Sequence, residues 1–405
     1  MRVRIALAAL VLLLAAAVSP APAAAVTARQ PGNPRLQALL DDLVANGASG
    51  ALARVDDGHH TWRLAAGAAR LDPRQPLTPA ARLRVGSVTK TFVATVALQL
   101  VGAGRLGLDD TVERRLPGLV PHGDAITLRM LLGHTSGLFD YTDDPAFLRR
   151  VTEDPTRPAT PRELISVATA HPPTFPPGTS WGYSNTNYIV TGLILEAATG
   201  RSVEQLVRQR ILRPLGLRGT YFPVGAPEIA GYHAHGYAPP ALTGAGYVDV
   251  TPFAPSLAWA AGAIVSTTDD LHRFYAALLG GRLLRPAQLR EMTTTVPVLP
   301  TLGYGLGLFT ARRACGTVWG HDGGIPGYVT FAYTDRAGRR GAVVALPTQP
   351  DQDLAALFAL TVDTAVCQMF GRVPPAAASS GTSASIIGSL PRHTGVSDKN
   401  PMIIR

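Results

Sequence analysis

Strand-like segments lie towards both ends of this chain, and helical patterns fill the long stretch between them. The predicted strands cover residues 50–55, 61–65, 304–308, 328–334 and 341–346. Strands this far apart in the sequence can still pair edge to edge in one sheet, and helices then cover the apolar faces of that sheet. The pattern therefore predicts an α+β fold, with one antiparallel sheet built from both chain ends, flanking helices and a largely helical second lobe.

Helical periodicity marks the segments around and between these strands. The predicted helices cover residues 36–44, 86–101, 162–170, 187–199, 268–279 and 353–370. Because the chain shows no internal repeat, we expect one bilobed domain over residues 33–372. Its sheet lobe would comprise about residues 33–95 and 296–372, and its helical lobe about residues 96–295.

The two chain ends predict processing rather than folding. Residues 1–25 combine Arg2 and Arg4 with an apolar run and an alanine-rich exit, which is typical of a cleavable secretory signal. Residues 373–405 are rich in Ala, Ser, Gly and Pro, so we expect a disordered or processed tail. No later apolar run is long enough to span a bilayer. The sequence thus predicts a secreted, extracellular protein without a stable membrane anchor.

Cys315 and Cys367 are the only cysteines. In an exported protein such a pair predicts a disulfide, and two separate buried thiols are the alternative. In the chain-entropy model, closing this loop would stabilise the fold by about 3–5 kcal/mol. The net charge of +9 comes from scattered arginines without interleaved aromatic residues. This pattern argues against a nucleic-acid partner.

Lys90 is one of only two lysines in the chain, although Lys and Arg together number 37. The other, Lys399, lies in the polar tail. An arginine side chain cannot give up its proton in a protein, whereas a desolvated lysine can become a base. Ser87 precedes Lys90 by three residues, so the pair would present a nucleophile and its activator one helical turn apart. The alternative is a solvated surface lysine, but the apolar run over residues 92–101 predicts a buried helix.

Two further short segments follow in order, Tyr183-Ser184-Asn185 and His321-Asp322-Gly323. Each of the three segments is weak alone, but the ordered trio resembles the serine penicillin-recognising hydrolases. That family includes class C β-lactamases, D-alanyl-D-alanine peptidases and related esterases, and the match is nearest to the secreted actinomycete D-alanyl-D-alanine carboxypeptidases. The resemblance runs from about residue 33 to 370 and includes residues 132–138, 260–263, 303–307 and the cysteine pair.

This resemblance implies an acyl-enzyme on Ser87. Lys90 and Tyr183 would share the proton transfers, with the acylation base left open between them. The backbone N–H groups of Ser87 and Gly324 would stabilise the oxyanion. Asn185 would hold the substrate amide and support Lys90. The full set of implied substrate-binding residues is Asn185, His321, Asp322, Gly323, Gly324 and Trp259. For Trp259, packing against the helical lobe is an equal alternative.

Two positions depart from the family's peptidases. Asp322 stands where they place Thr or Ser to bind the substrate's terminal carboxylate, and Phe309 stands where we expect an arginine. Arg312 or Arg313 could replace that arginine only if the strand register shifted. Two carboxylates repel each other by about 1–4 kcal/mol at 4 Å, depending on the local dielectric. Both departures weaken recognition of a free C-terminal acid and leave the proton-transfer residues intact.

The main reading from the family is therefore a D-alanyl-D-alanine carboxypeptidase acting on peptidoglycan-type peptides. Alternatives with the same fold are an esterase, a D-amino-acid amidase or aminopeptidase, and a β-lactamase. A non-enzymatic alternative is a sensor that penicillin acylates once. We expect a monomer that takes a small-molecule or peptide substrate, such as D-Ala-D-Ala peptides, β-lactams or esters. The family implies no metal and no organic cofactor.

Two other histidine patterns are weaker. His233-Ala234-His235 has the spacing of a metal site, but no cysteine or acidic partners recur around it in a zinc pattern. His134 lies in a Gly-His-Thr-Ser-Gly segment, where a Ser-His-Asp triad is conceivable. Because the serine there lacks the Gly-x-Ser-x-Gly elbow, we predict a turn residue instead.

Overall fold

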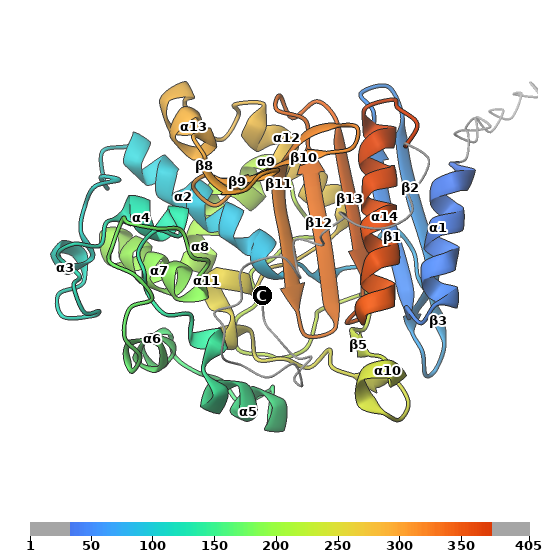
Figure 1. The fold of residues 1–405 in the computed structure, drawn as a ribbon, viewed down its shortest axis with the longest axis horizontal. Coiled ribbons are helices and arrows are strands. Elements are labelled where there is room, and N and C mark those ends of the chain that lie inside the picture. The colour runs from blue at the N-terminus through green and yellow to red at the C-terminus, as the bar shows by residue number, and fades with distance from the viewer. Residues whose placement is uncertain (1–32, 375–405) are drawn as a thin grey trace, which may run out of the picture. The chain divides into compact units, whose positions relative to one another are not determined.

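A computed structural model describes residues 33–374, which belong to one compact unit. A nine-stranded sheet with the order β3-β2-β1-β13-β12-β11-β10-β9-β8 forms its centre (Figure 1). These strands are β1 (Gly50–Asp56), β2 (Thr61–Arg70), β3 (Gln75–Pro76), β8 (Val296–Leu299), β9 (Leu302–Tyr304), β10 (Phe309–Arg313), β11 (Gly316–Ile325), β12 (Tyr328–Thr334) and β13 (Gly341–Leu346). Two short pairs join β4 (Leu83–Arg84) to β7 (Val265–Ser266) and β5 (Tyr237–Ala238) to β6 (Val248–Asp249).

Helices cover the sheet and build the rest of the unit. They are α1 (Pro34–Ala45), η1 (Gly86–Val88), α2 (Thr89–Gly102), α3 (Val112–Arg115), α4 (Leu128–Gly133), η2 (Tyr141–Asp143), α5 (Pro145–Glu153), α6 (Pro161–Thr169), α7 (Asn185–Thr199), α8 (Val203–Val207), η3 (Arg208–Leu212), α9 (Arg213–Leu215), α10 (Pro240–Thr243), η4 (Pro255–Leu257), α11 (Trp259–Gly262), α12 (Thr268–Leu279), α13 (Pro286–Thr293) and α14 (Gln352–Met369).

The central strands confirm that the sheet is built from both chain ends. β1 pairs with β13 in antiparallel register, with Leu52 opposite Ala345. Both strands are buried along almost their whole length because each face of the sheet is covered. One face packs against α1 and α14, which lie side by side (Figure 1), and the other packs against α12. The predicted α+β fold class is therefore correct.

The predicted strand over residues 304–308 is wrong, because most of this segment forms the turn between β9 and β10. Gly307 has a φ of +75°, and Gly305 N–H donates to the Leu308 carbonyl at 2.8 Å. A Cβ on Gly307 would lie 2.5 Å from Ala94 of α2, so the turn packs directly on that helix. The alternating glycines therefore serve a close approach rather than a strand.

The His321-Asp322-Gly323 segment lies inside β11. A two-residue turn then connects Ile325 to Tyr328 at the start of β12. The pairing of β10 with β11 ends at Phe309 opposite Gly320. Residues 321–325 therefore extend past β10 and leave one strand edge free.

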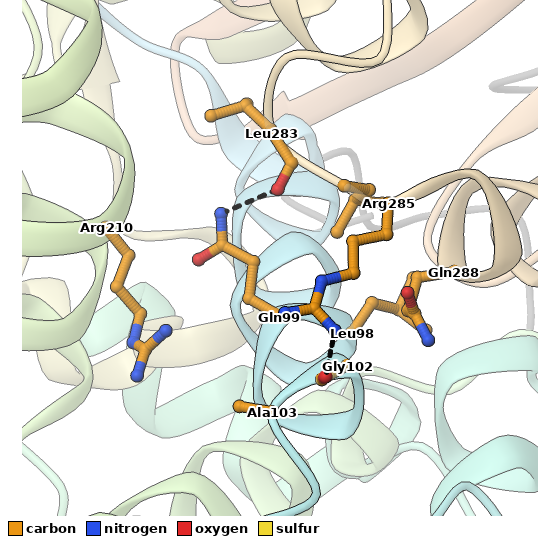
Figure 2. Close-up of a pocket in the computed structure, with 9 residues that line it drawn as sticks. Leu98, Gln99, Gly102, Ala103, Arg210, Leu283, Arg285 and Gln288 are labelled. Carbon is orange, nitrogen blue, oxygen red and sulfur yellow. Dashed lines mark hydrogen bonds between the residues drawn. The ribbon is translucent and has the colours of Figure 1, made fainter.

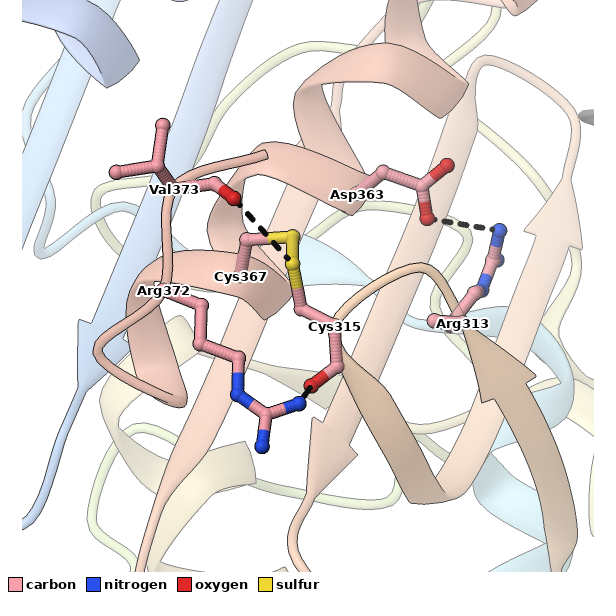
Figure 3. Close-up of a disulfide and its surroundings, with 6 residues drawn as sticks. All are labelled: Arg313, Cys315, Asp363, Cys367, Arg372 and Val373. Carbon is pink, nitrogen blue, oxygen red and sulfur yellow. Dashed lines mark hydrogen bonds and ion pairs between the residues drawn. A yellow bond between two sulfur atoms is a disulfide. The ribbon is translucent and has the colours of Figure 1, made fainter. Parts of the chain in front are cut away.

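Cys315 and Cys367 form the predicted disulfide, with 4.9 Å between their Cα atoms (Figure 3). It ties the loop between β10 and β11 to α14. Arg372 donates to the Cys315 carbonyl at 2.7 Å, which adds a second link between this loop and the chain beyond α14. The strand that carries the third motif is thus attached at its start to the last helix.

The predicted secretory signal, residues 1–25, lies outside the described residues, and so does the tail apart from residues 373 and 374. Within the described range, no helix combines the length and apolarity needed to cross a membrane. The boundary between a sheet lobe and a helical lobe stays a prediction.

Candidate functional site

Ser87 and Lys90 lie at the start of one continuous helical segment, η1 followed by α2. Lys90 is fully buried and Ser87 is 4% exposed. The apolar residues of α2 account for this burial, as the sequence predicted. Lys90 Nζ lies 2.9 Å from Ser87 Oγ. As a residue of the first turn, Ser87 also keeps a backbone N–H that no earlier carbonyl of the helix accepts.

Lys90 Nζ has two further neighbours that can only accept hydrogen bonds. The Asn185 Oδ1 atom lies at 2.7 Å and the Ala261 carbonyl oxygen at 2.8 Å. A neutral amine has two protons and one lone pair. When both protons go to Asn185 and Ala261, the lone pair is left facing Ser87 Oγ. The arrangement therefore suits an amine that takes a proton from Ser87.

The electrostatics around Lys90 favour this neutral form. Burial lowers the pKa of Lys90 to about 7, and the nearby Asp140 and Asp322 carboxylates oppose that shift. Nζ also lies 4.9 Å from the centre of the Tyr183 ring and 5.6 Å from that of Tyr188. A large fraction of Lys90 is thus uncharged at neutral pH.

Tyr183 is the third predicted proton-transfer residue, and the structure places it over Lys90. Its hydroxyl is buried and makes no hydrogen bond of regular geometry within residues 33–374. Burial raises the pKa of Tyr183 well above 10, and Ser87 is the neighbour that opposes this shift. Tyr183 is therefore a protonated phenol beside Ser87, and its O–H is available to a substrate.

Asp140 is a buried member of this cluster that the sequence analysis missed. Its Oδ2 accepts from both the Asn185 backbone N–H and the side-chain Nδ2, each at 3.0 Å. Its Oδ1 accepts from the Thr142 N–H at 3.0 Å and hydroxyl at 2.9 Å. Burial raises the pKa of Asp140 to about 6, with Asp143 adding to the shift. No local pattern marks Asp140, since its partner lies 45 residues further along the chain.

His134 holds the loop that carries Tyr183. It ends α4 with a φ of +60°, which confirms the predicted turn position. Its Nδ1 accepts from the Ser184 backbone N–H at 3.2 Å and lies 3.1 Å from Asn187 Nδ2. Its ring centre lies 4.2 Å from that of Tyr183. Burial lowers the pKa of His134 well below 6.5, so the ring is neutral and can accept both bonds.

The free edge of β11 runs beside the Ser87 turn. A Cβ on Gly323 would lie 2.0 Å from the Val85 carbonyl oxygen, and one on Gly86 would lie 2.7 Å from that of Gly324. Only glycine allows this approach of two backbones. The Ile325–Tyr328 pair closes the turn to β12, so the alternation of antiparallel pairing points the Gly324 N–H away from β12. It therefore faces the same free edge as Ser87.

His321 is buried and neutral. Burial lowers the pKa of His321 to about 3. Its Nε2 lies 3.2 Å from the Tyr304 hydroxyl, and its Nδ1 lies 2.5 Å from the Asp322 carbonyl oxygen. With Nδ1 donating to that carbonyl, Nε2 accepts from Tyr304. His321 thus fixes the backbone of this strand edge and contributes no positive charge.

Asp322 is the one residue of β11 with a carboxylate, and the pKa of this group is raised. Burial raises the pKa of Asp322 to about 6, and Arg313 and Lys90 oppose the shift. Its Oδ1 lies 3.7 Å from Nδ1 of His321, and because that ring is neutral the contact is not an ion pair. Because Phe309 pairs with Gly320, two residues before Asp322, Phe309 and Asp322 occupy one face of the sheet.

No register shift brings an arginine to the place of Phe309. Phe309 is buried, with its ring centre 4.5 Å from that of Tyr304 and 4.8 Å from that of His321. Arg313 Nη1 pairs instead with Asp363 of α14 at 3.2 Å (Figure 3). Arg312, the other candidate, is exposed. The part of the site that would hold a terminal carboxylate therefore has an aromatic ring in place of a cation.

Trp259 packs against the helical part of the fold, as the packing alternative predicted, and its role as a substrate contact stays a prediction. A Cβ on Gly192 of α7 would lie 2.7 Å from the Trp259 ring, so the indole packs against that helix. Its Nε1 donates to Glu204 at 3.2 Å. Trp259 has a φ of +32°, a strained value for a non-glycine residue. The turn it forms leads directly to Ala261, whose carbonyl accepts from Lys90.

A separate cavity of about 230 Å³ lies at the other end of α2 (Figure 2). There Gln99 donates to the Leu283 carbonyl at 3.0 Å, and Arg285 donates to the Gly102 carbonyl at 3.2 Å. Its lining contains no residue of the three motifs.

No group of three or more His, Cys, Asp or Glu side chains suited to a metal ion occurs among residues 33–374. His235 pairs with Asp249 at 2.7 Å.

Known proteins resemble this chain along most of its described length. The family model for beta-lactamase matches residues 36–365. Penicillin-binding protein 4* of Bacillus subtilis (strain 168) is 29% identical over 290 residues, and a D-aminopeptidase of Cereibacter sphaeroides (strain KD131 / KCTC 12085) is 30% identical over 294 residues. These matches cover 67% and 70% of this chain. The chain spans only 61% and 53% of the length of these two relatives.

Two solved structures share the fold over 84% of this chain and 99% of their own. A D-stereospecific amidohydrolase from Streptomyces sp. has a TM-score of 0.76 and 40% identity. The D-amino acid amidase from Ochrobactrum anthropi SV3, complexed with L-phenylalanine, has a TM-score of 0.74 and 29% identity. Because the family model and the shared fold both extend over nearly the whole described structure, this chain belongs to the beta-lactamase family and has the fold of that family.

Proposed function

We propose that this protein hydrolyses amides or short peptides of D-amino acids that carry a free amino group, through an acyl-enzyme on Ser87. The observation that carries this proposal is Asp322, a buried carboxylate at the free edge of β11 on the same face as Phe309. A carboxylate there attracts an ammonium group and repels a terminal acid. The likeness to a D-stereospecific amidohydrolase, a D-amino acid amidase and a D-aminopeptidase supports the same substrate class.

Acylation begins with the hydroxyl of Ser87. Neutral Lys90 takes the Ser87 proton, and Ser87 Oγ attacks the substrate carbonyl carbon. The N–H groups of Ser87 and Gly324 stabilise the oxyanion. Lys90 is assigned as the base because its pKa is lowered to about 7, whereas that of Tyr183 is raised well above 10. Lys90 is therefore the group that has a free lone pair at neutral pH.

The leaving amine then needs a proton. Tyr183 donates its phenolic proton to that amine and recovers one from the ammonium of Lys90, which lies beneath its ring. The carbon–nitrogen bond breaks, and the acyl group remains on Ser87. Water attacks the ester in the second half-reaction, with the same groups moving protons in reverse.

Carboxypeptidase action, the main reading from the sequence, fits this site less well. The carboxylate of Asp322 and the ring of Phe309 would both meet the substrate's terminal acid, and Arg313 is engaged by Asp363. Esterase and β-lactamase activities remain compatible with the acylating residues. No feature of the site among the described residues favours esters or β-lactams over a substrate with a free amine.

Asp322→Asn tests the substrate class. A charge-assisted hydrogen bond contributes about 1.5–3 kcal/mol, so kcat/KM for a D-alanine anilide should fall by about 10- to 100-fold. The N-acetylated anilide, which has no ammonium, is the matched substrate and should change by less than about three-fold. Wild-type preference for a peptide ending in D-Ala-D-Ala over the free-amine anilide would instead restore the carboxypeptidase reading.

The pH dependence of kcat/KM follows from the pKa of Lys90. Below about pH 7 Lys90 is protonated and has no lone pair for Ser87, so the rate with an uncharged ester should rise as the pH rises through about 7. With free-amine substrates, protonation of Asp322 below about pH 6 should steepen the loss. Rates measured from pH 5 to 9 with a p-nitrophenyl ester check this. If the rate instead fell as the pH rose through 7, the base would be a group other than Lys90.

Steady-state turnover separates the enzyme from the sensor alternative, because a sensor gives one burst equal to the enzyme concentration with every substrate.

We also infer that the protein is exported. The composition of residues 1–25 supports export, and the Cys315–Cys367 disulfide suits an oxidising compartment. The expectation of a monomer stays a prediction.

A further inference from the structure

Asn185 has no side-chain donor left for a substrate. Its Nδ2 carries two protons, and the structure provides an acceptor for each: Asp140 Oδ2 at 3.0 Å and Thr142 Oγ1 at 3.2 Å. Thr142 Oγ1 can accept because its own proton goes to Asp140 Oδ1 at 2.9 Å. The remaining polar atom, Oδ1, accepts from Lys90. Both donor hydrogens of this amide are therefore already used within the protein, and its oxygen accepts from Lys90.

The carboxylate of Asp140 determines which way round this amide lies. A carboxylate only accepts, so the Asn185 atom facing it must be the donor Nδ2, and Oδ1 must face Lys90. With the amide reversed, Nδ2 would face Lys90 Nζ, and its protons would compete with Ser87 for the lone pair of Lys90. Asp140 Oδ2 would then face Asn185 Oδ1, with no proton between them. The carboxylate of Asp140 excludes this second orientation.

We propose that Asp140 is a positioning residue that fixes the Asn185 amide, and through it directs the lone pair of Lys90 at Ser87, so that Asn185 binds Lys90 and not the substrate. This corrects the expectation that Asn185 holds the substrate amide. The proposal rests on the proposed role of Lys90 as base, but not on the substrate class. It can therefore be tested with p-nitrophenyl acetate, which has neither an amino group nor an amide.

The charged and titratable groups around Lys90 come from several elements. Asp140 precedes η2, Asp322 and His321 belong to β11, His134 ends α4, and the Tyr183 and Tyr188 rings lie over Nζ. Asp140 and Asp322 are the two whose charge raises the pKa of Lys90, and Asp140 has the larger effect. Removing the charge of Asp140 should thus move the acidic limb of the rate profile to lower pH.

Asp140→Asn should lower kcat for p-nitrophenyl acetate by about 10- to 100-fold, because small displacements of a reacting group cost rates of this order. KM should stay within about three-fold, and the acidic limb should lie at lower pH than in the wild type. A purely structural loss would reduce the rate without moving the limb. Unchanged kcat together with an unmoved limb would overturn the proposal.

Asp144→Asn is the matched control in the same loop. Its carboxylate accepts from the Phe147 N–H at 2.6 Å and lies 2.9 Å from His171 Nε2, so this change should lower the melting temperature but leave kcat and the limb in place. If Asp140→Asn does not fold, Thr142→Val carries the test. It removes the second acceptor of Asn185 without changing a charge, so it should lower kcat at constant KM with the limb unmoved, whereas Thr142→Ser, which keeps the hydroxyl, should retain near-wild-type kcat. A Thr142→Val enzyme with wild-type kcat would count against the proposal.

The role of Asn185 itself gives a second readout. Asn185→Ala should lower kcat by a similar factor with both substrates, p-nitrophenyl acetate and a D-alanine anilide. A loss confined to the anilide, seen as a higher KM, would mean that Asn185 binds substrate and that the proposal is wrong. Loss of all anilide turnover with the ester pattern intact would instead count against the proposed substrate class alone.

Discussion

Ser87→Ala is expected to lower kcat by at least about 10⁴-fold with every substrate, because no other group can form the acyl-enzyme. The fold should remain intact. The lost hydroxyl contacts Lys90, which keeps its bonds to Asn185 and Ala261. Intact-mass measurement after mixing with a p-nitrophenyl ester should show one added acyl group on the wild type and none on the variant.

Ser184→Ala is the control for this experiment. Ser184 is the buried residue immediately before α7, and its Oγ donates to the Phe139 carbonyl at 3.3 Å. Its loss should change kcat by less than about ten-fold and preserve the acyl adduct. An adduct of normal yield on Ser87→Ala would show that another residue is the nucleophile.

Lys90→Arg is expected to lower kcat by about 10³-fold or more, although it keeps a long basic side chain at this position. A guanidinium has no lone pair to offer and keeps its proton at any pH the fold survives. The side chain of Lys90 is fully enclosed, so the larger group would also displace Asn185 or Ala261. Rates with p-nitrophenyl acetate from pH 6 to 9 check the result, and no increase in pH should restore activity.

Lys90→Met separates the two causes in that variant. Methionine matches the length of the lysine side chain and fits the apolar walls of the helix, but it supplies no base. An equal loss in both variants would assign the effect to the missing lone pair. Near-normal rates with Lys90→Arg would mean that Lys90 acts through its charge and that a different group takes the proton of Ser87.

The parts of the fold that the sequence predicts well are those set by local pattern. Strands β12 and β13 have the predicted bounds, as does α12, because a run of apolar residues ended by turn residues leaves few alternatives. The Ser87–Lys90 pair was equally readable, since three residues make one helical turn. The turn at Gly305 and Gly307 was misread, because alternating glycines follow the period of a strand although they serve a close contact with α2.

Contacts between distant segments could not be read in the same way. Asp140 and Asn185 meet across 45 residues, and His134 reaches Ser184 across 50. A lone aspartate after a Gly-Leu-Phe run is as typical of a helix cap or a turn as of a buried anchor. The partners of Asn185 were hidden for the same reason, because nothing nearby in the sequence shows that both of its side-chain donors contact Asp140 and Thr142.

The glycine contact between Gly86 and Gly324 has a consequence for the order of events during synthesis. The nucleophile turn is made early, but the strand edge opposite it arrives more than two hundred residues later, and β1 must also wait for β13 before it has its central partner. A chain that stops before β11 therefore lacks the strand edge that faces Ser87. We expect such a fragment to be inactive even when the Ser87 turn is already made, because the two sides of the proposed site come from distant parts of the sequence.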